Sequence, residues 1–172
     1  MQQKRLGKGG LIALIVVLSA VPPLSTDMLM PALPDIADYF QANTTLVSFA
    51  ITEFFIGMAL GMLVLGPVSD RFGRKPVLVA SIAASTVLAL ACAFSTSIYM
   101  LLALRFVQSI GAGGMVALGT ALVKDCYDGK QMGRMLAIVT AISTFAPMVA
   151  PVVGAALLAM AGWRSSFVVL AV

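Results

Sequence analysis

Five long apolar runs separated by short polar breaks constrain the fold of this 172-residue chain more than any other feature. About 20 consecutive apolar residues allow an α-helix to cross a bilayer, so each run predicts a membrane-spanning helix. Only 10% of the residues are charged, against roughly 25% in soluble domains. The predicted spans, followed by a sixth run too short to cross, are residues 10–32, 45–66, 77–94, 99–123, 135–161 and 164–172. We therefore expect an all-α integral membrane protein with five full spans and a truncated sixth, so that the chain ends inside a helix.

Nine of the eleven Lys and Arg residues lie in three polar segments. An alternating path through the five spans places all three segments on the same side of the membrane. Because cytoplasmic loops carry an excess of Lys and Arg, this side and the N-terminus are predicted to be cytoplasmic. We interpret the segments as determinants of topology rather than as lipid or nucleic-acid sites. They contain Lys4, Arg5 and Lys8; Arg71, Arg74 and Lys75; and Lys124, Lys130 and Arg134.

Prolines mark the first predicted span and its end. Pro22 and Pro23 lie inside the apolar run, where they are expected to kink the helix and free backbone carbonyls. Pro31 and Pro34, followed by the acidic Asp35, are expected to end the span in a loop without Lys or Arg.

Three ionisable residues lie within the predicted spans: Asp27, Glu53 and Arg105. Each costs a few kcal/mol at the bilayer centre if it faces lipid, so we expect all three to face the interior of the helix bundle. At about 1.5 Å per residue, they lie within roughly 5 Å of one another in depth. We therefore predict that Arg105 pairs with Asp27, with Glu53 or with both.

Two interpretations of these three residues remain open. A buried ion pair could serve only to fix the register of the helices. Alternatively, two acids beside one base leave one acid that could exchange a proton, which is what a proton-coupled transporter needs.

Small residues recur at helical spacing on two of the spans. Gly57 and Gly61 form G-x-x-x-G on the second span, and Ser109, Gly113 and Ala117 share one face of the fourth. Faces of this kind let helix backbones approach closely in a membrane. We therefore expect both faces to lie in tight helix contacts.

A charged segment, residues 65–76, connects the second and third spans. Five of its twelve residues are Gly, Pro or Ser, and four are charged: Asp70, Arg71, Arg74 and Lys75. A connection this short predicts a tight helical hairpin at the membrane surface, because glycine lets two helix ends approach each other.

The charged segment carries a resemblance to a known family. Its pattern Gly66-x-x-x-Asp70-Arg71-x-Gly73-Arg74-Lys75-Pro76 resembles the motif between helices 2 and 3 of the major facilitator superfamily. The run that begins at Arg105 resembles the fourth-helix motif of the same superfamily, with Gln108 three residues later and Ser109 where glycine is usual.

Further motifs narrow the resemblance. Pro147, Pro151 and Gly154 resemble the fifth-helix antiporter motif, although alanines stand at three positions where glycines are usual. Ser25-Thr26-Asp27-Met28, the following Pro-Ala-Leu-Pro and Trp163-Arg164-x-x-Phe167 resemble the drug-resistance branch of the Bcr/CflA type. The resemblance covers essentially the whole chain.

The resemblance implies that the chain is the N-terminal six-helix half of a twelve-helix drug/proton antiporter, built as a 3+3 inverted repeat. It implies that Asp27 and Glu53 are proton and cation sites and that Arg105, with Gln108 beside it, tunes them. It further implies that Asp70, Arg71 and Arg74 form a cytoplasmic gate, with Gly66, Gly73 and Lys75 in the same motif. Pro147, Pro151 and Gly154 would shape the hinge between the halves.

The expected partners are a small-molecule substrate, protons, the lipid bilayer of the cytoplasmic membrane and a C-terminal half, with no nucleic acid, cofactor or metal. An enzyme is the least expected class, because the chain has no His and no nucleophile–base pair. Two alternatives stay open: a metabolite carrier for a sugar, amino acid or polyamine, and a truncated membrane fragment without transport activity.

Overall fold

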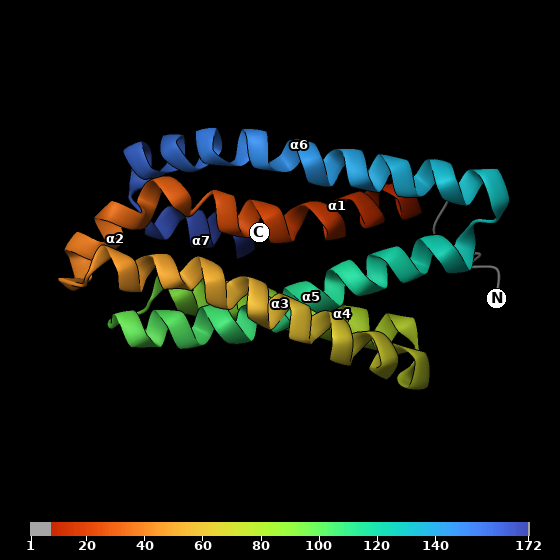
Figure 1. Ribbon diagram of the computed structural model, residues 1–172, viewed down its shortest axis with the longest axis horizontal. Coiled ribbons are helices and arrows are strands. Elements are labelled where there is room, and N and C mark those ends of the chain that lie inside the picture. The colour runs from red at the N-terminus through yellow and green to blue at the C-terminus, as the bar shows by residue number, and fades with distance from the viewer. Residues whose placement is uncertain (1–7, 172) are drawn as a thin grey trace.

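The structure, a computed structural model, describes residues 8–171. Within that range the chain forms seven α-helices and one 3₁₀ helix, η1 (Figure 1). The elements in chain order are α1 (Lys8–Asp27), η1 (Met30–Ala32), α2 (Leu33–Phe40), α3 (Thr44–Phe72), α4 (Arg74–Ala93), α5 (Ile98–Cys126), α6 (Gly129–Ala161) and α7 (Arg164–Ala171). Five stretches are long and apolar enough to cross a membrane, as the sequence predicted.

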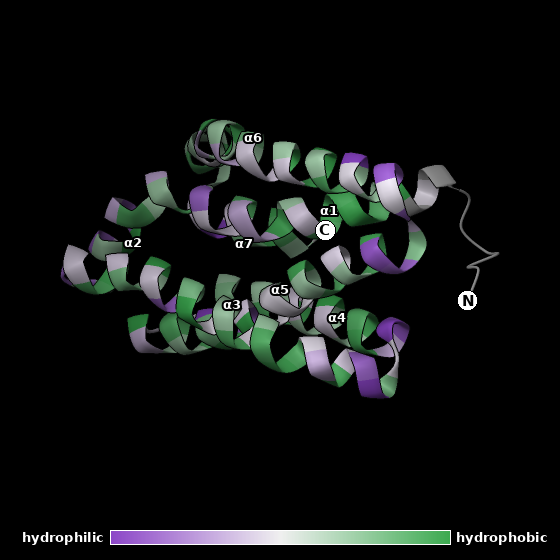
Figure 2. Ribbon diagram, turned by 45° about the vertical axis from the view of Figure 1, so that its right-hand side comes forward, coloured by the Kyte–Doolittle hydropathy of each residue, from purple (hydrophilic) through white to green (hydrophobic). Residues whose placement is uncertain are grey.

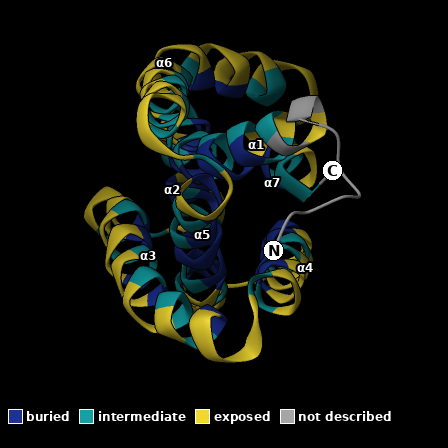
Figure 3. Ribbon diagram, turned by 90° about the vertical axis from the view of Figure 1, so that its right-hand side faces the viewer, coloured by how far each residue is buried: buried dark blue, intermediate teal, exposed yellow. Residues whose placement is uncertain are grey.

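The helix α5 is the centre of the bundle. It lies between α3 and α4 and also packs against α1 (Figure 3). The helix α6 lies outside α1 and packs mainly on it, and the short α7 packs on α4 and α6. Six large apolar side chains of α6 are exposed, whereas α5 is buried along most of its length.

Small residues bring α3 and α5 together backbone to backbone. A Cβ atom added at Gly57 would collide with the Ser109 hydroxyl, and one added at Gly61 would collide with the carbonyl group of Ile110. From the other side, a Cβ on Gly113 would lie 2.9 Å from the backbone nitrogen of Met62 on α3. The predicted tight contact of these two faces is therefore confirmed.

The connection between α3 and α4 is shorter than the sequence suggested. The helix α3 continues through Pro67 to Phe72, so the expected end of this helix at residue 66 is wrong. Only Gly73 separates the two helices, and its φ of +95° lies in a region that favours glycine. The helix extends beyond its apolar part because its polar last turn still forms internal hydrogen bonds and can face water.

The first span is longer than predicted. It covers Ile12–Phe40, because η1 and α2 follow α1 after a short break behind Asp27. The expected loop across residues 33–40 is therefore wrong. Pro31 and Pro34 each lie in the first turn of a helix, where the missing N–H would have had no partner.

The adjacent prolines of α1 leave the helix continuous up to Asp27. Pro23 has no N–H for the carbonyl of Ser19, and the hydroxyl of Ser143 on α6 donates to that carbonyl at 3.5 Å. A side chain of a neighbouring helix thus satisfies the group that proline frees.

The two ends of the bundle differ in charge. The start of α1, the turn at Gly73 and the turn between α5 and α6 share one end, here called the basic end (Figures 1 and 2). The opposite end, here called the α2 end, holds α2 and the turns between α4 and α5 and between α6 and α7. The basic segments of the described residues therefore lie together as predicted, while Lys4 and Arg5 fall outside those residues.

Candidate functional site

The side chain of Arg105 is buried in the middle of the bundle, on α5, with 0% of the residue exposed. Its Nη1 donates to Ser25 Oγ of α1 at 2.9 Å and to Gln108 Oε1 at 3.4 Å. Its Nη2 donates to the backbone carbonyl of Ser25 at 3.3 Å. The guanidinium group thus holds α1 against α5.

Two aromatic rings flank the same guanidinium. Its central carbon lies 4.4 Å from the ring centroid of Phe54 on α3 and 5.7 Å from that of Phe167 on α7. Contacts of a cation with ring faces at these distances are attractive, and more so away from water. Four helices therefore meet at Arg105.

The predicted ion pair of Arg105 is absent. Among the described residues, no ion pair joins it to Asp27 or Glu53, so that prediction is wrong. Neighbouring residues on a helix point about 100° apart, so a similar depth along two helices does not bring two side chains together. The helix α3 presents Phe54 to the arginine, and Glu53 lies to the side.

Glu53 is the most unusual group in this region. Its Oε1 atom is buried and has no hydrogen-bond partner among the described residues. Asp27 is half-buried at the C-terminal end of α1, two residues after Ser25. A buried carboxylate oxygen without a partner is costly in its charged form, and a bound proton removes that charge.

Gln108 lies where the sequence motif placed it, next to Arg105. The residue is buried, with 4% exposed, and its backbone carbonyl accepts a hydrogen bond from Ser85 Oγ of α4 at 3.4 Å. Sequence reasoning missed the roles of Ser25, Phe54 and Phe167. The nearest signals were their positions beside Asp27, beside Glu53 and in the Trp163-Arg164-x-x-Phe167 pattern.

Arg74 organises the charged groups of the basic end. Its Nη1 lies 2.7 Å from Asp70 Oδ1, and its Nε donates to Asp125 Oδ2 at the end of α5 over 3.0 Å. Nη1 also donates to Ser69 Oγ at 2.8 Å. The role of Asp125 was missed from the sequence, because this residue lies 51 positions from Arg74 in the chain. The arginine ties the turn between α3 and α4 to α5.

A groove of about 310 Å³ lies between the C-terminal turns of α3 and α5. Gly66 and Asp70 line one wall, and Thr120 and Asp125 line the other. A Cβ added at Gly66 would meet no atom within 4 Å, so this side of α3 is open. The side chains of Arg71 and Lys75 are exposed nearby.

The fifth-helix motif lies on α6. Pro147 and Pro151 are inside this helix, and Gly154 is buried. A Cβ on Gly154 would lie 2.8 Å from the Cα atom of Met28, so the glycine lets α6 approach the break after α1. Within residues 8–171, no group of three His, Cys, Asp or Glu side chains is placed to hold a metal ion.

The family model of the Major Facilitator Superfamily matches residues 15–172 of the sequence. The chain belongs to the Major Facilitator Superfamily. Its fold is therefore that of the N-terminal half of a major facilitator transporter, consistent with the five spans and the partial sixth helix of the structure.

Several curated proteins are similar to this Major Facilitator Superfamily chain. An "Uncharacterized MFS-type transporter YdgK" of Bacillus subtilis is 35% identical over 98% of this chain and 42% of its own length. A "Bicyclomycin resistance protein homolog" of Haemophilus influenzae is 32% identical over 90% of this chain and 39% of its own. A "Multidrug transporter MdfA" of Yersinia pestis is 31% identical over 98% and 42%. The chain spans about two fifths of the length of these relatives.

Proposed function

We propose that this chain is half of a proton-coupled exporter of drugs or other small amphipathic molecules, which works by alternating access in the cytoplasmic membrane. The observation that carries the proposal is the buried, unpartnered oxygen of Glu53 beside the buried Arg105. Membership of a transporter family favours this interpretation, because ionisable groups inside a membrane bundle commonly serve proton relays and substrate pathways.

The contacts of Arg105 leave a neighbouring carboxyl group free to bind and release a proton. Ser25 and Gln108 accept hydrogen bonds from the terminal nitrogens of the guanidinium, and no ion pair joins the arginine to Glu53 or Asp27 among the described residues. Each carboxyl group can then gain a proton on one side of the membrane and lose it on the other. Gln108 keeps Arg105 in place while this occurs.

The names of two relatives support drugs as the substrate class, since one is called a multidrug transporter and the other a bicyclomycin resistance protein homolog. A half-buried acid at Asp27 suits a cationic or amphipathic substrate. A metabolite carrier of the same fold is the competing outcome, and a substrate screen separates the two.

The groove at the basic end fits a cytoplasmic gate. Asp70 and Arg74 hold the ends of α3, α4 and α5 together within this half, and the open side of Gly66 leaves room for a helix of a C-terminal half. Arg71 and Lys75 would face the cytoplasm. On α6, Gly154 and the two prolines of the fifth-helix motif would lie at the hinge between the halves.

The test uses the complete protein that contains this chain, expressed in bacteria that lack their main drug exporters. Drug susceptibility and proton-driven export from inverted vesicles are measured for Asp27→Asn and Glu53→Gln. Asp38→Asn serves as the matched control, because Asp38 is an exposed acid on α2. We expect at least one of the two buried-site variants to abolish export while the control retains it.

Full proton-dependent export by both Asp27→Asn and Glu53→Gln would refute the coupling role of these acids. Export restricted to a sugar, amino acid or polyamine would refute the drug assignment. Failure of the unaltered complete protein to move any substrate would refute the exporter proposal.

A further inference from the structure

The proposed function gives no role to Trp163, Arg164 and Phe167, here called the α7 clamp. These residues lie in and after the turn between α6 and α7, at the α2 end. Trp163 is 6% exposed and Phe167 is fully buried.

Arg164 joins three elements. Its Nε donates to the backbone carbonyl of Ala93, at the C-terminal end of α4, over 2.9 Å. Its Nη2 donates to the Tyr39 hydroxyl of α2 at 2.9 Å. The guanidinium carbon also lies 4.6 Å from the ring centroids of both Tyr39 and Trp163. One side chain thus connects α2, α4 and the start of α7.

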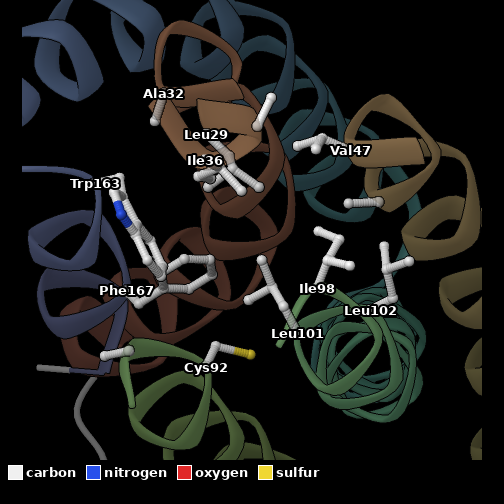
Figure 4. Close-up of a cluster of buried hydrophobic side chains, with 13 residues drawn as sticks. Leu29, Ala32, Ile36, Val47, Cys92, Ile98, Leu101, Leu102, Trp163 and Phe167 are labelled. Atoms are coloured by element: carbon white, nitrogen blue, oxygen red, sulfur yellow. The ribbon is translucent and has the colours of Figure 1, made fainter. Parts of the chain in front are cut away.

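Trp163 continues these contacts inward. Its ring centroid lies 5.6 Å from that of Tyr39, 5.7 Å from that of Phe40 and 6.1 Å from that of Phe167. Figure 4 shows Trp163 and Phe167 side by side in the buried cluster that also contains Cys92. This cluster closes the α2 end of the bundle.

Phe167 forms the last link to the buried site. One of its neighbours is Trp163, and its ring also lies 5.7 Å from the guanidinium carbon of Arg105. A continuous set of contacts therefore runs from Arg164 near the surface, through two aromatic rings, to Arg105.

We propose that the α7 clamp holds the α2 end closed and positions Arg105, so that opening of this end changes the surroundings of the arginine. This inference rests on the proposed function, because it assigns a gate to the same transport cycle. When Arg164 releases Tyr39 and Ala93, α7 can shift and Phe167 withdraws from Arg105. The buried arginine then loses one of its two flanking rings.

The effect of losing the Phe167 contact depends on the other charged and titratable groups around Arg105. Glu53 of α3 and Cys92 of α4 are the titratable groups near Arg105 on those two helices. Asp27 follows Ser25 on α1 by two residues. Loss of the Phe167 contact leaves Ser25, Gln108 and Phe54 as the remaining contacts of the guanidinium and changes the surroundings that Arg105 shares with Glu53 and Asp27. Opening of the α2 end is thereby linked to the availability of an acid.

The thiol of Cys92 offers a direct readout of the clamp, because the residue is 0% exposed and precedes Ala93. The complete protein, with its other cysteines replaced by serine, is treated with N-ethylmaleimide in membranes. Arg164→Gln removes two hydrogen bonds from a charged donor, to Ala93 and to Tyr39. We expect it to raise the rate of Cys92 labelling at least about tenfold, which is the effect of losing one such bond. Arg164→Lys, which keeps the charge, should give a smaller increase.

Arg134→Gln is the matched control, because Arg134 is an exposed arginine at the basic end. It should leave the labelling rate of Cys92 unchanged. Equal labelling rates for the unaltered protein and Arg164→Gln would overturn the clamp. Equal rates for Arg164→Gln and Arg134→Gln would overturn it as well.

The link to Arg105 needs a second measurement, the pH profile of export. Phe167→Leu removes the ring that flanks the arginine and should shift the pH profile of export. Phe167→Tyr keeps the ring and should give the same pH profile as the unaltered protein. An unchanged profile in Phe167→Leu would overturn the positioning role. The labelling experiment does not depend on transport, so it still tests the clamp if Asp27→Asn and Glu53→Gln refute proton coupling.

Discussion

Replacing Gly61 with alanine tests whether α3 and α5 are in backbone contact. The new Cβ would lie 2.8 Å from the carbonyl carbon of Ile110 and closer still to its oxygen, whereas ordinary contact begins near 3.4 Å. Because the obstacle is helix backbone rather than a movable side chain, the two helices must separate. Overpacking of this kind costs about 1–3 kcal/mol.

Gly133→Ala provides the matched comparison. Gly133 lies in α6, and a Cβ there would meet no atom within 4 Å. Both substitutions gain about 1 kcal/mol of helix propensity over glycine, so the difference between the two variants isolates the cost of the collision.

The assay is thermal unfolding of the purified complete protein in detergent, followed by the reaction of buried Cys92 with a thiol-reactive dye in a Cys126→Ser background. A difference of 1 kcal/mol shifts the melting temperature by roughly 2–4 °C in a domain of 150–250 residues, and by less in a longer protein. We expect Gly61→Ala to melt measurably below Gly133→Ala, by at most about 12 °C on this scale. Equal melting temperatures would refute the backbone contact between α3 and α5.

Three further predictions follow from the described contacts. Arg105→Lys should reduce export about tenfold through loss of one charge-assisted hydrogen bond, and unchanged drug resistance at equal membrane abundance would contradict this. An impermeant maleimide should label exposed Cys126 in inverted vesicles but not in intact cells, and should leave buried Cys92 unlabelled in both. Labelling of Cys126 in intact cells would place the basic end outside the cell. Arg74→Gln should lower export in vesicle assays but change the melting temperature little, because its exposed pair with Asp125 contributes less than about 1 kcal/mol. A large change in melting temperature would contradict this small contribution to stability.

The number of spans and the close packing of the two small-residue faces were predictable because both depend on local patterns. A run of apolar residues fixes a span, and glycines four residues apart fix a small face, whatever surrounds them. The ends of helices were less predictable. Hydropathy detects the apolar part, but α3 continues to Phe72 and α2 includes Pro34, since backbone hydrogen bonds and not apolarity determine where a helix stops.

The buried site was predicted in position but not in its contacts. Depth along each helix follows from residue counting, which correctly brought Glu53 and Arg105 into one region. The rotation of each helix about its axis depends on packing with its neighbours, and that rotation presents Phe54 rather than Glu53 to the arginine. The contact of Asp125 with Arg74 also depends on how helices pack, because the two residues lie 51 positions apart in the chain. It therefore could not be predicted from local sequence.

The central place of α5 has a consequence for how the protein is made. This helix is the least apolar of the five spans and the most buried, and it carries Arg105. Alone in lipid, an arginine at mid-helix costs about 2.5–3.5 kcal/mol even on the most lenient scale. The helices α1, α3 and α4 precede α5 in the chain, so its partners are already in the membrane when the ribosome delivers it. The order of the helices is thus also an order of assembly, in which α7 follows α5 and places Phe167 beside an arginine that is already surrounded.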